Sequence, residues 1–308
     1  MSAWGIIGDG PWGLALSARL AQNGHQVTVG GLVRKRKGIP RGVKHTVELD
    51  KLLSDHERLI LALPIDQVEN FLETYCTHLG PRQRIMSTAR GLTPSTHLRA
   101  TEAIRAQSAV RQLAVLAGAA GARALLDKAP VALVVGSPFS SWSAEVQKAL
   151  WSHSLRIYTN DDIAGVELAN VAASVVGVAL GVARAIDVGA AAEATALTRA
   201  LAEMNRVVGG LGGRDATAYG LAGLGVLGEM LYAGQGASFR AGRSLVDGTF
   251  DASHFREVRE STRTLAARVT RHRINAPLVM AVEAMFSGKL TAQNALARLM
   301  ERPVGAET

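Results

Sequence analysis

This chain of 308 residues has little cysteine, few aromatic side chains and no long uncharged apolar run. Its single cysteine, Cys76, excludes an intramolecular disulfide and a zinc site built from several cysteines, and it fits a reducing compartment such as the cytoplasm. The longest apolar run, Leu168 to Ala183, has about 16 residues, whereas a membrane span needs roughly 18 to 20. A buried helix is therefore expected there, and neither a membrane span nor a metal site is predicted.

Aromatic residues make up only 5% of a chain whose formal net charge is +8. Basic residues cluster at positions 34–37, with Arg41 and Lys44 close behind, and they recur along a predicted helix between Arg256 and Arg273. Proteins that bind single-stranded nucleic acid combine such charge with aromatic stacking platforms. Because no aromatic residues interleave with these charges, a nucleic-acid partner is not expected. A solvated loop and a solvated helix face are the favoured interpretations.

The first half of the chain alternates short β-branched runs with helix-like segments. Strands are expected at 4–7, 26–29, 59–63, 84–87, 113–117 and 131–135. From about Asp161, Ala/Leu/Val stretches with helical spacing predict helices at 168–186, 193–208, 217–231, 257–272 and 276–287. We therefore expect an α/β Rossmann-type domain with a doubly wound parallel sheet over residues 1–160, and an all-helical domain over residues 161–308.

A glycine-rich turn, GDGPWG at residues 8–13, lies between the first expected strand and an amphipathic helix-like stretch. Gly8 would make the tight turn, Gly10 would leave room for phosphates, and Gly13 would let the helix pack closely on the strand. Such a turn brings a dinucleotide pyrophosphate to a helix N-terminus, where N–H groups and the helix dipole favour an anion. Dinucleotide binding is the prediction, and a purely structural glycine turn is the alternative.

Several motifs together resemble those of the bacterial NAD(P)-dependent glycerol-3-phosphate dehydrogenases. The GDGPWG turn is similar to the GxGxWG of that family, and residues 89–92 to its Lys-Gly-Leu motif. Residues 158–169 match the family's entry into its helical domain, and residues 62–64, 117–122, 201–204 and 219–225 match further segments. The resemblance spans nearly the whole chain. It implies a dinucleotide-binding domain, a helical domain that brings the catalytic groups, and a place in glycerophospholipid metabolism.

The departures from that family fall on the residues that carry its chemistry. Without gaps, Ala173 stands at the family's catalytic lysine, Val226 at an aspartate and Met230 at a threonine. Ala237 and Ser238 replace an Arg-Asn pair that holds the charged end of the substrate. Loss of one positioned acid/base group typically lowers a rate about 10²–10⁴-fold. The comparison thus implies that no catalytic set is intact and that the standard reaction is impaired or lost, which leaves a binding, regulatory or structural role.

Some substrate contacts of the family are nevertheless kept. Arg90 replaces a substrate-binding lysine and keeps its charge, although arginine is a poor proton donor. Gly118 and Arg240 are the other candidates for substrate contact. The alternative function is therefore a working oxidoreductase on glycerol 3-phosphate and dihydroxyacetone phosphate, or on a less charged ketone/alcohol pair. The sequence leaves open whether the site is unused or reshaped.

On the cofactor side, the resemblance assigns Pro11, Trp12, Ala122 and Glu260 to the nucleotide, together with the three glycines of the turn. No acidic residue ends the second strand, where it would bind a ribose 2′-hydroxyl. The basic run that begins at Arg34 would instead suit a 2′-phosphate, so NADP(H) is favoured over NAD(H). The sequence leaves the oligomeric state open, with a homodimer as one option.

Overall fold

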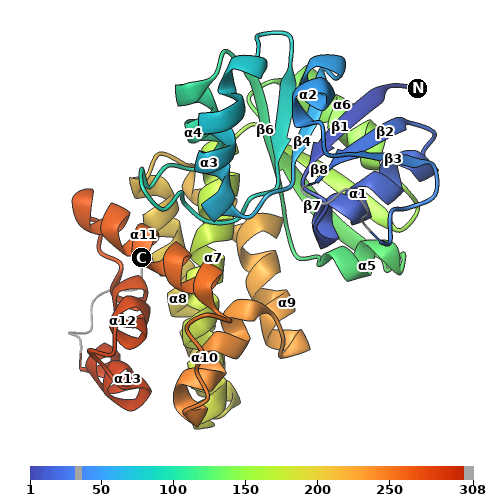
Figure 1. The fold of residues 1–308 in the computed structure, drawn as a ribbon. Coiled ribbons are helices and arrows are strands. Elements are labelled where there is room, and N and C mark those ends of the chain that lie inside the picture. Colours follow the sequence, from blue (N-terminus) through green and yellow to red (C-terminus); the bar gives the residue numbers. More distant parts are fainter. Residues whose placement is uncertain (32–36, 302–308) are drawn as a thin grey trace.

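A computed structural model describes residues 1–31 and 37–301, and it has a sheet-containing N-terminal part joined to a helical C-terminal part (Figure 1). In these residues one sheet contains eight strands in the order β3-β2-β1-β4-β5-β6-β7-β8. The strands are β1 (Ala3–Ile7), β2 (Gln26–Gly30), β3 (Val43–Thr46), β4 (Arg58–Leu61), β5 (Arg84–Ser87), β6 (Gln112–Ala117), β7 (Val131–Gly136) and β8 (Leu155–Asn160). The expected α/β part followed by a helical part is confirmed.

The sheet differs from the sequence-based expectation in the direction of one pairing and in two additional strands. Neighbouring strands are parallel throughout, except that β7 runs antiparallel to β6, with Val115 opposite Gly136. Strands β3 and β8 were not expected. In β8 the buried Leu155 and Ile157 alternate with exposed Arg156 and Tyr158, so the strand lacks the continuous apolar run that marks a buried parallel strand.

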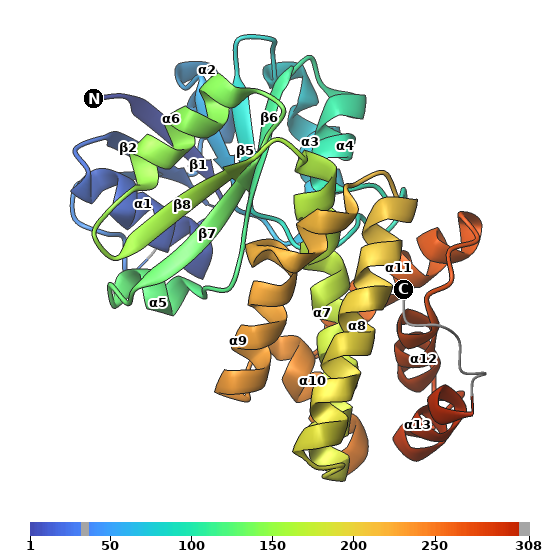
Figure 2. The same ribbon diagram turned by 180° about the vertical axis from the view of Figure 1, so that it is seen from behind.

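Helices cover both faces of the sheet (Figure 2). They are α1 (Pro11–Gln22), α2 (Leu49–Asp55), α3 (Ile65–Tyr75), α4 (Ala100–Gln107), α5 (Ala122–Leu126) and α6 (Ser140–Leu150), with a 3₁₀ turn at Cys76–His78. Each face of the sheet packs against its own hydrophobic cluster. Side chains along β4 contribute alternately to the two clusters, because successive side chains of a strand point to opposite faces. Ile60 packs in the cluster that includes α1 and α6, whereas Leu59 and Leu61 pack in the cluster that includes α2, α3 and α4.

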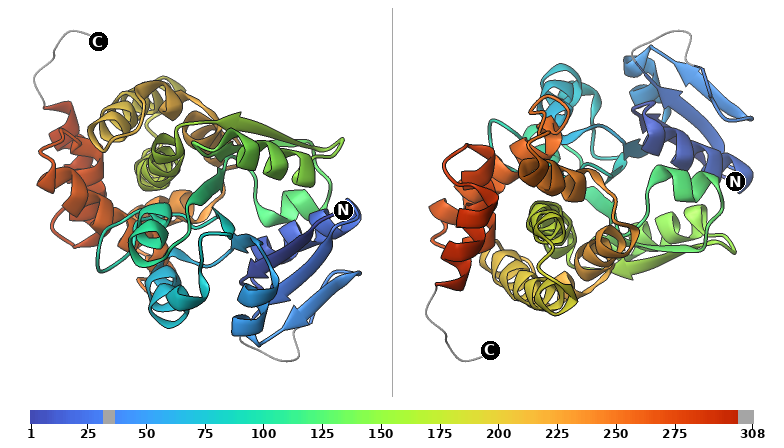
Figure 3. Two further views of the ribbon diagram at one scale, coloured as in Figure 1. Left: turned by 90° about the horizontal axis from the view of Figure 1, so that it is seen from above. Right: turned by 90° about the horizontal axis from the view of Figure 1, so that it is seen from below.

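The helical part is built around one long helix, α7 (Ile163–Ile186), seen end-on among the other helices in Figure 3. The others are α8 (Ala190–Gly210), α9 (Val226–Ala233), α10 (Ala237–Asp247), α11 (Arg256–Arg271), α12 (Pro277–Phe286) and α13 (Ala292–Met300). By length and composition α7 could cross a membrane, but 83% of its most apolar window is buried inside the fold. Close packing explains this burial: a Cβ on Gly181 would lie 2.1 Å from the Phe239 carbonyl oxygen of α10.

The segment expected as one helix over 217–231 is divided in three. A 3₁₀ helix (Asp215–Tyr219) leads into a π-helical turn (Leu221–Gly225), and only then does α9 begin. A Cβ on Gly223 would lie 2.0 Å from the Ala218 carbonyl oxygen, so the backbone closes on itself here in a way that needs glycine. The expected helix starting at 168 begins five residues earlier, because the Asp162 side chain accepts a hydrogen bond from the Gly165 amide at 2.8 Å and caps it. Helices α10 and α13 were not expected.

Candidate functional site

A cavity of about 470 Å³ lies between the carboxyl ends of the sheet strands and the helical part. The glycine turn and the loops after β4, β5 and β6 line it from the sheet side. Helices α7, α9 and α11 and the start of α10 line it from the other side. In open α/β sheets, ligands bind in the crevice outside the carboxyl ends of the strands, so this cavity is the candidate functional site.

The glycine turn has the close contacts that only glycine permits. Gly8 has φ = 111°, and its N–H donates to the Gly30 carbonyl oxygen at 2.9 Å. A Cβ on Gly13 would lie 1.9 Å from the Gly8 carbonyl oxygen, so the start of α1 packs directly on the end of β1. A Cβ on Gly10 would meet nothing within 4 Å. Gly10 therefore leaves open space at the N-terminus of α1, where the first N–H groups have no partner within the helix.

A carboxylate of the same turn reaches the ends of β2 and β3. Oδ2 of Asp9 lies 3.4 Å from Nε2 of His45, which is on β3. A Cβ on Gly31, just after β2, would lie 2.1 Å from that carboxylate oxygen. An acidic group thus occupies the end of β2 although the sequence of β2 contains none. Nothing in the sequence of β2 signals this acid, because it comes from the turn after β1.

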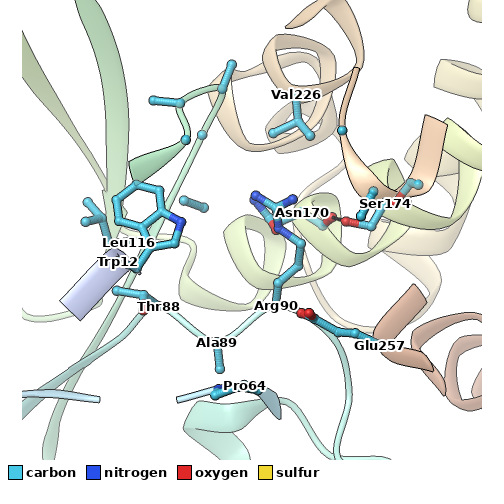
Figure 4. A pocket seen from close by; sticks show the side chains of 18 of the residues that line it. Trp12, Pro64, Thr88, Ala89, Arg90, Leu116, Asn170, Ser174, Val226 and Glu257 are labelled. Carbon is cyan, nitrogen blue, oxygen red and sulfur yellow. Dashed lines mark hydrogen bonds between the residues drawn. The ribbon is translucent and has the colours of Figure 1, made fainter. Parts of the chain in front are cut away.

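One face of α7 contributes Glu167, Asn170 and Ser174 to the cavity, at spacings that place side chains on the same side of a helix. Ser174 Oγ donates to the Asn170 carbonyl oxygen at 3.1 Å. The Asn170 side chain is only 6% exposed and faces the cavity (Figure 4). Ala173 is fully buried in the helical core and is not among the lining residues.

Arg90 brings a positive charge into the cavity from the loop after β5 (Figure 4). Burial lowers the pKa of its guanidinium, and the carboxylates of Glu257 and Glu229, which line the same cavity, oppose that shift. Partial burial raises the pKa of Glu257; Arg90 opposes this effect and Asp66 adds to it. Around Arg90, the lining therefore places one cation near two acidic groups.

A hydrogen-bonded ion network fixes α7 against the N-terminal part. The buried Glu167 carboxylate pairs with Arg99 at 2.8 Å and accepts bonds from the hydroxyl and the amide of Thr101. Arg99 also pairs with Glu102 at 2.9 Å, and Glu102 pairs with Arg268 of α11 at 2.9 Å. Glu167 is thus engaged in holding the cavity walls together, which leaves Arg90, Glu229 and Glu257 as the charged side chains of the lining that have no such partner within the described chain.

The remaining sequence-based candidates divide into two groups. Pro11, Trp12, Gly118, Val226 and Met230 line the cavity, as do the two residues at the start of α10 that replace the Arg-Asn pair, Ala237 and Ser238.

Ala122, Glu260 and Arg240 do not line it. Ala122 packs against the sheet core, Glu260 pairs with Arg263 at 2.9 Å, and Arg240 is exposed on α10. Arg34 lies outside the described residues.

Several polar lining residues were not anticipated from the sequence, among them Asn170, Glu229 and Glu257. For Asn170 a signal exists, because it stands three residues after Glu167 and four before Ser174 on one helix. The two glutamates come from separate helices, α9 and α11, and their approach to Arg90 depends on how those helices pack.

Comparisons with known proteins place the chain in a family. Residues 32–143 match the family model of the NAD-dependent glycerol-3-phosphate dehydrogenase N-terminus, and residues 162–297 match that of the C-terminus. The chain is 30% identical to a glycerol-3-phosphate dehydrogenase (NAD(P)+) of Cereibacter sphaeroides over 98% of this chain and 99% of that one. It is 32% identical to the protein of the same name from a Synechococcus strain, over 98% and 95%.

Solved structures of glycerol-3-phosphate dehydrogenases are also similar to this chain. The crystal structure of glycerol-3-phosphate dehydrogenase from Coxiella burnetii aligns with a TM-score of 0.89 at 26% identity, covering 97% of this chain and 99% of that one. The yeast enzyme aligns with a TM-score of 0.80 at 16% identity, over 97% and 99%, and supports the fold. The chain therefore belongs to the NAD-dependent glycerol-3-phosphate dehydrogenase family.

Proposed function

We propose that this protein binds a nicotinamide dinucleotide at its glycine turn and that the standard reaction of its family is impaired or lost. The observation that carries the second part is the composition of the cavity wall. At Val226, Met230 and Ala237 the wall is apolar where the resemblance places an aspartate, a threonine and an arginine. Ala173, at the position of the catalytic lysine, is buried in the core.

The glycine turn supports the dinucleotide. Gly10 leaves space that a Cβ would fill, and α1 presents its N-terminus to that space. Trp12 and the loop after β6 line the cavity next to the turn. Pro11 supplies no N–H, so the anion would be held by fewer backbone donors than in a turn with serine there.

Reduction of a ketone needs a proton at the developing alkoxide as well as the hydride that a bound nicotinamide supplies. Val226, Met230 and Ala237 have no proton to give. Arg90 is a poor acid, because an arginine guanidinium keeps its proton in proteins. Loss of one such group lowers a rate about 10²–10⁴-fold, and the loss of several in one site explains an impaired reaction.

Other parts of the proposal depend on the sequence alone. NADP(H) is favoured over NAD(H) because of the basic run at 34–37, most of which lies outside the described residues; the Asp9 carboxylate at the end of β2 works against this preference. A cytoplasmic location is part of the proposal because the single cysteine fits a reducing compartment, and a homodimer stays one option. We also propose a division of the chain between residues 160 and 161.

A second candidate function is an active oxidoreductase on a less charged ketone/alcohol pair. The observation that favours it is the polar group set that the cavity keeps: Asn170, Ser174 and Ser238 line it beside Arg90. An unused cavity has no need of these groups.

Fluorescence titration with NADH and NADPH tests the dinucleotide part, because Trp12 lines the cavity and its emission should be quenched on binding. The expected result is saturable quenching that is largely lost in Trp12→Phe, with calorimetry showing that the variant still binds. Trp151→Phe is the matched control, since Trp151 is half exposed and lies outside this cavity. Absence of binding by calorimetry with both dinucleotides would refute this part.

A further inference from the structure

Two buried polar side chains face the cavity without a protein partner. Asn170 is 6% exposed and Ser238 is 5% exposed, and both line the cavity. Within the described residues, neither the Asn170 amide nor the Ser238 hydroxyl makes a hydrogen bond to another protein group. Buried polar groups are nearly always hydrogen-bonded, because leaving them unpaired destabilises the fold. Both groups line the cavity, so they are available to bond to a polar molecule that enters it.

The charges around these two groups restrict what that molecule is. Arg90 is the cation of this end of the cavity, and Glu229 and Glu257 both act on it electrostatically. When both glutamates are ionised, the three side chains together carry one net negative charge. A phosphate monoester adds a charge of about −1.5 to −2 at neutral pH, so the two glutamates at the rim of the cavity would repel it.

The apolar part of the cavity wall also disfavours a phosphate group. A phosphate group is normally held by several charge-assisted bonds, of which bidentate arginine contacts are the strongest. At the start of α10 the lining offers Ala237 and Ser238, a methyl group and one hydroxyl. The donors and acceptors that remain, from Asn170, Ser238 and Arg90, suit hydroxyl and carbonyl oxygens of an uncharged molecule.

We propose that this end of the cavity binds a small uncharged hydroxyketone or polyol and discriminates against its phosphate ester. Asn170 and Ser238 bond to hydroxyl oxygens of the ligand, Arg90 donates to a carbonyl or hydroxyl oxygen, and Glu229 and Glu257 exclude the phosphate. The inference rests on the proposed function only in that the dinucleotide shares the cavity. It holds whether or not the protein turns the ligand over.

Binding of dihydroxyacetone and of dihydroxyacetone phosphate to the full chain, followed by ligand-observed NMR, tests the proposal. The expected result is saturable binding of dihydroxyacetone, with the phosphate ester at least about tenfold weaker. Asn170→Ala and Ser238→Ala should each weaken dihydroxyacetone binding about tenfold. Asn70→Ala on α3, where the side chain is exposed, is the matched control and should change nothing.

A charge variant supplies a readout that a loss of folding would not imitate. Glu229→Gln combined with Glu257→Gln should raise the affinity for dihydroxyacetone phosphate relative to dihydroxyacetone about tenfold or more, because two negative charges beside Arg90 are removed. An unchanged ratio would overturn the proposal. So would tighter binding of the phosphate ester by the unaltered protein, or no saturable binding of either compound.

Separate titration with NADH keeps the two proposals distinct. If dihydroxyacetone binds and NADH does not, the dinucleotide assignment fails and the ligand assignment stands. If NADH binds and the preference between the two ketones is the reverse of that expected, only the ligand assignment fails.

Discussion

The Asp9 carboxylate of the glycine turn lies 3.4 Å from Nε2 of His45, at the carboxyl ends of β2 and β3. In dinucleotide-binding folds, an acid at the end of β2 accepts a hydrogen bond from the ribose 2′-hydroxyl. Here Gly30 and Gly31 end that strand, and Asp9 places its carboxylate against Gly31. A negative charge beside a ribose 2′ position favours a hydroxyl over a phosphate at that position.

Asp9→Asn should therefore raise the affinity for NADPH relative to NADH by about tenfold, since it removes that charge and keeps the shape of the side chain. Calorimetric titration with both dinucleotides measures the ratio. Asp55→Asn is the matched control, because Asp55 ends α2 just before β4 begins. It therefore lies at the amino ends of the strands, away from the glycine turn at their carboxyl ends. An equal change in both variants would show that Asp9 has no role in the discrimination.

The glycine turn gives a pair of substitutions with opposite expectations. Gly10→Ala fits the backbone, which has φ = −69°, and its Cβ meets nothing within 4 Å, so the free energy of unfolding should hardly change. The methyl group nevertheless occupies space reserved for the pyrophosphate, and NADH affinity should fall at least about tenfold.

Gly13→Ala should instead lower the free energy of unfolding by about 1–3 kcal/mol, because its Cβ would lie 1.9 Å from the Gly8 carbonyl oxygen. Urea unfolding and NADH titration of both variants separate the two effects. If Gly10→Ala binds NADH as the unaltered protein does, the dinucleotide does not lie at this turn.

Acid should weaken the ion pair between Glu102 of the N-terminal part and Arg268 of the helical part. Burial raises the pKa of this carboxyl, but hydrogen bonds and charges from Arg268 and Arg99 outweigh that effect and lower the pKa to about 2. In the unfolded chain the pKa is about 4.3. The folded state thus holds the proton less tightly, so Glu102 stabilises the fold fully above about pH 4.5, and this contribution is lost as the pH falls towards 2.

Glu102→Gln should therefore lower the free energy of unfolding at pH 7 by about 1–3 kcal/mol, a figure reduced for the 27% exposure of the side chain. Denaturant unfolding between pH 7 and pH 3.5 measures the difference between the variant and the unaltered protein. The difference should shrink below about pH 4.5. A difference that stays constant over this range would contradict the pairing.

The features that the sequence predicted are those that local spacing determines. The β1–turn–α1–β2 unit could be inferred because apolar runs and glycines stand at fixed distances along the chain. The antiparallel pairing of β6 with β7 could not, since strand direction depends on how the connection crosses the sheet. The break of the 217–231 helix depends on contacts of Gly223 with Ala218, which spacing does not reveal.

The same distinction applies to the candidate site. The glycine turn and Arg90 were found from motifs, because each lies in a short run that begins just after a strand. Asn170, Glu229 and Glu257 were not, because helices α7, α9 and α11 bring them together only in the folded protein. The Asp9 carboxylate was missed for a related reason: it acts at the end of β2 but belongs to the turn after β1.

The most direct test of the central claim is NADPH oxidation by the purified protein with dihydroxyacetone phosphate, at high enzyme concentration. The apolar wall at Val226, Met230 and Ala237 predicts no turnover above the rate measured without the ketone. Clear turnover would mean that other groups replace the missing acid and phosphate-binding residues, and it would contradict the proposal that the standard reaction is impaired or lost.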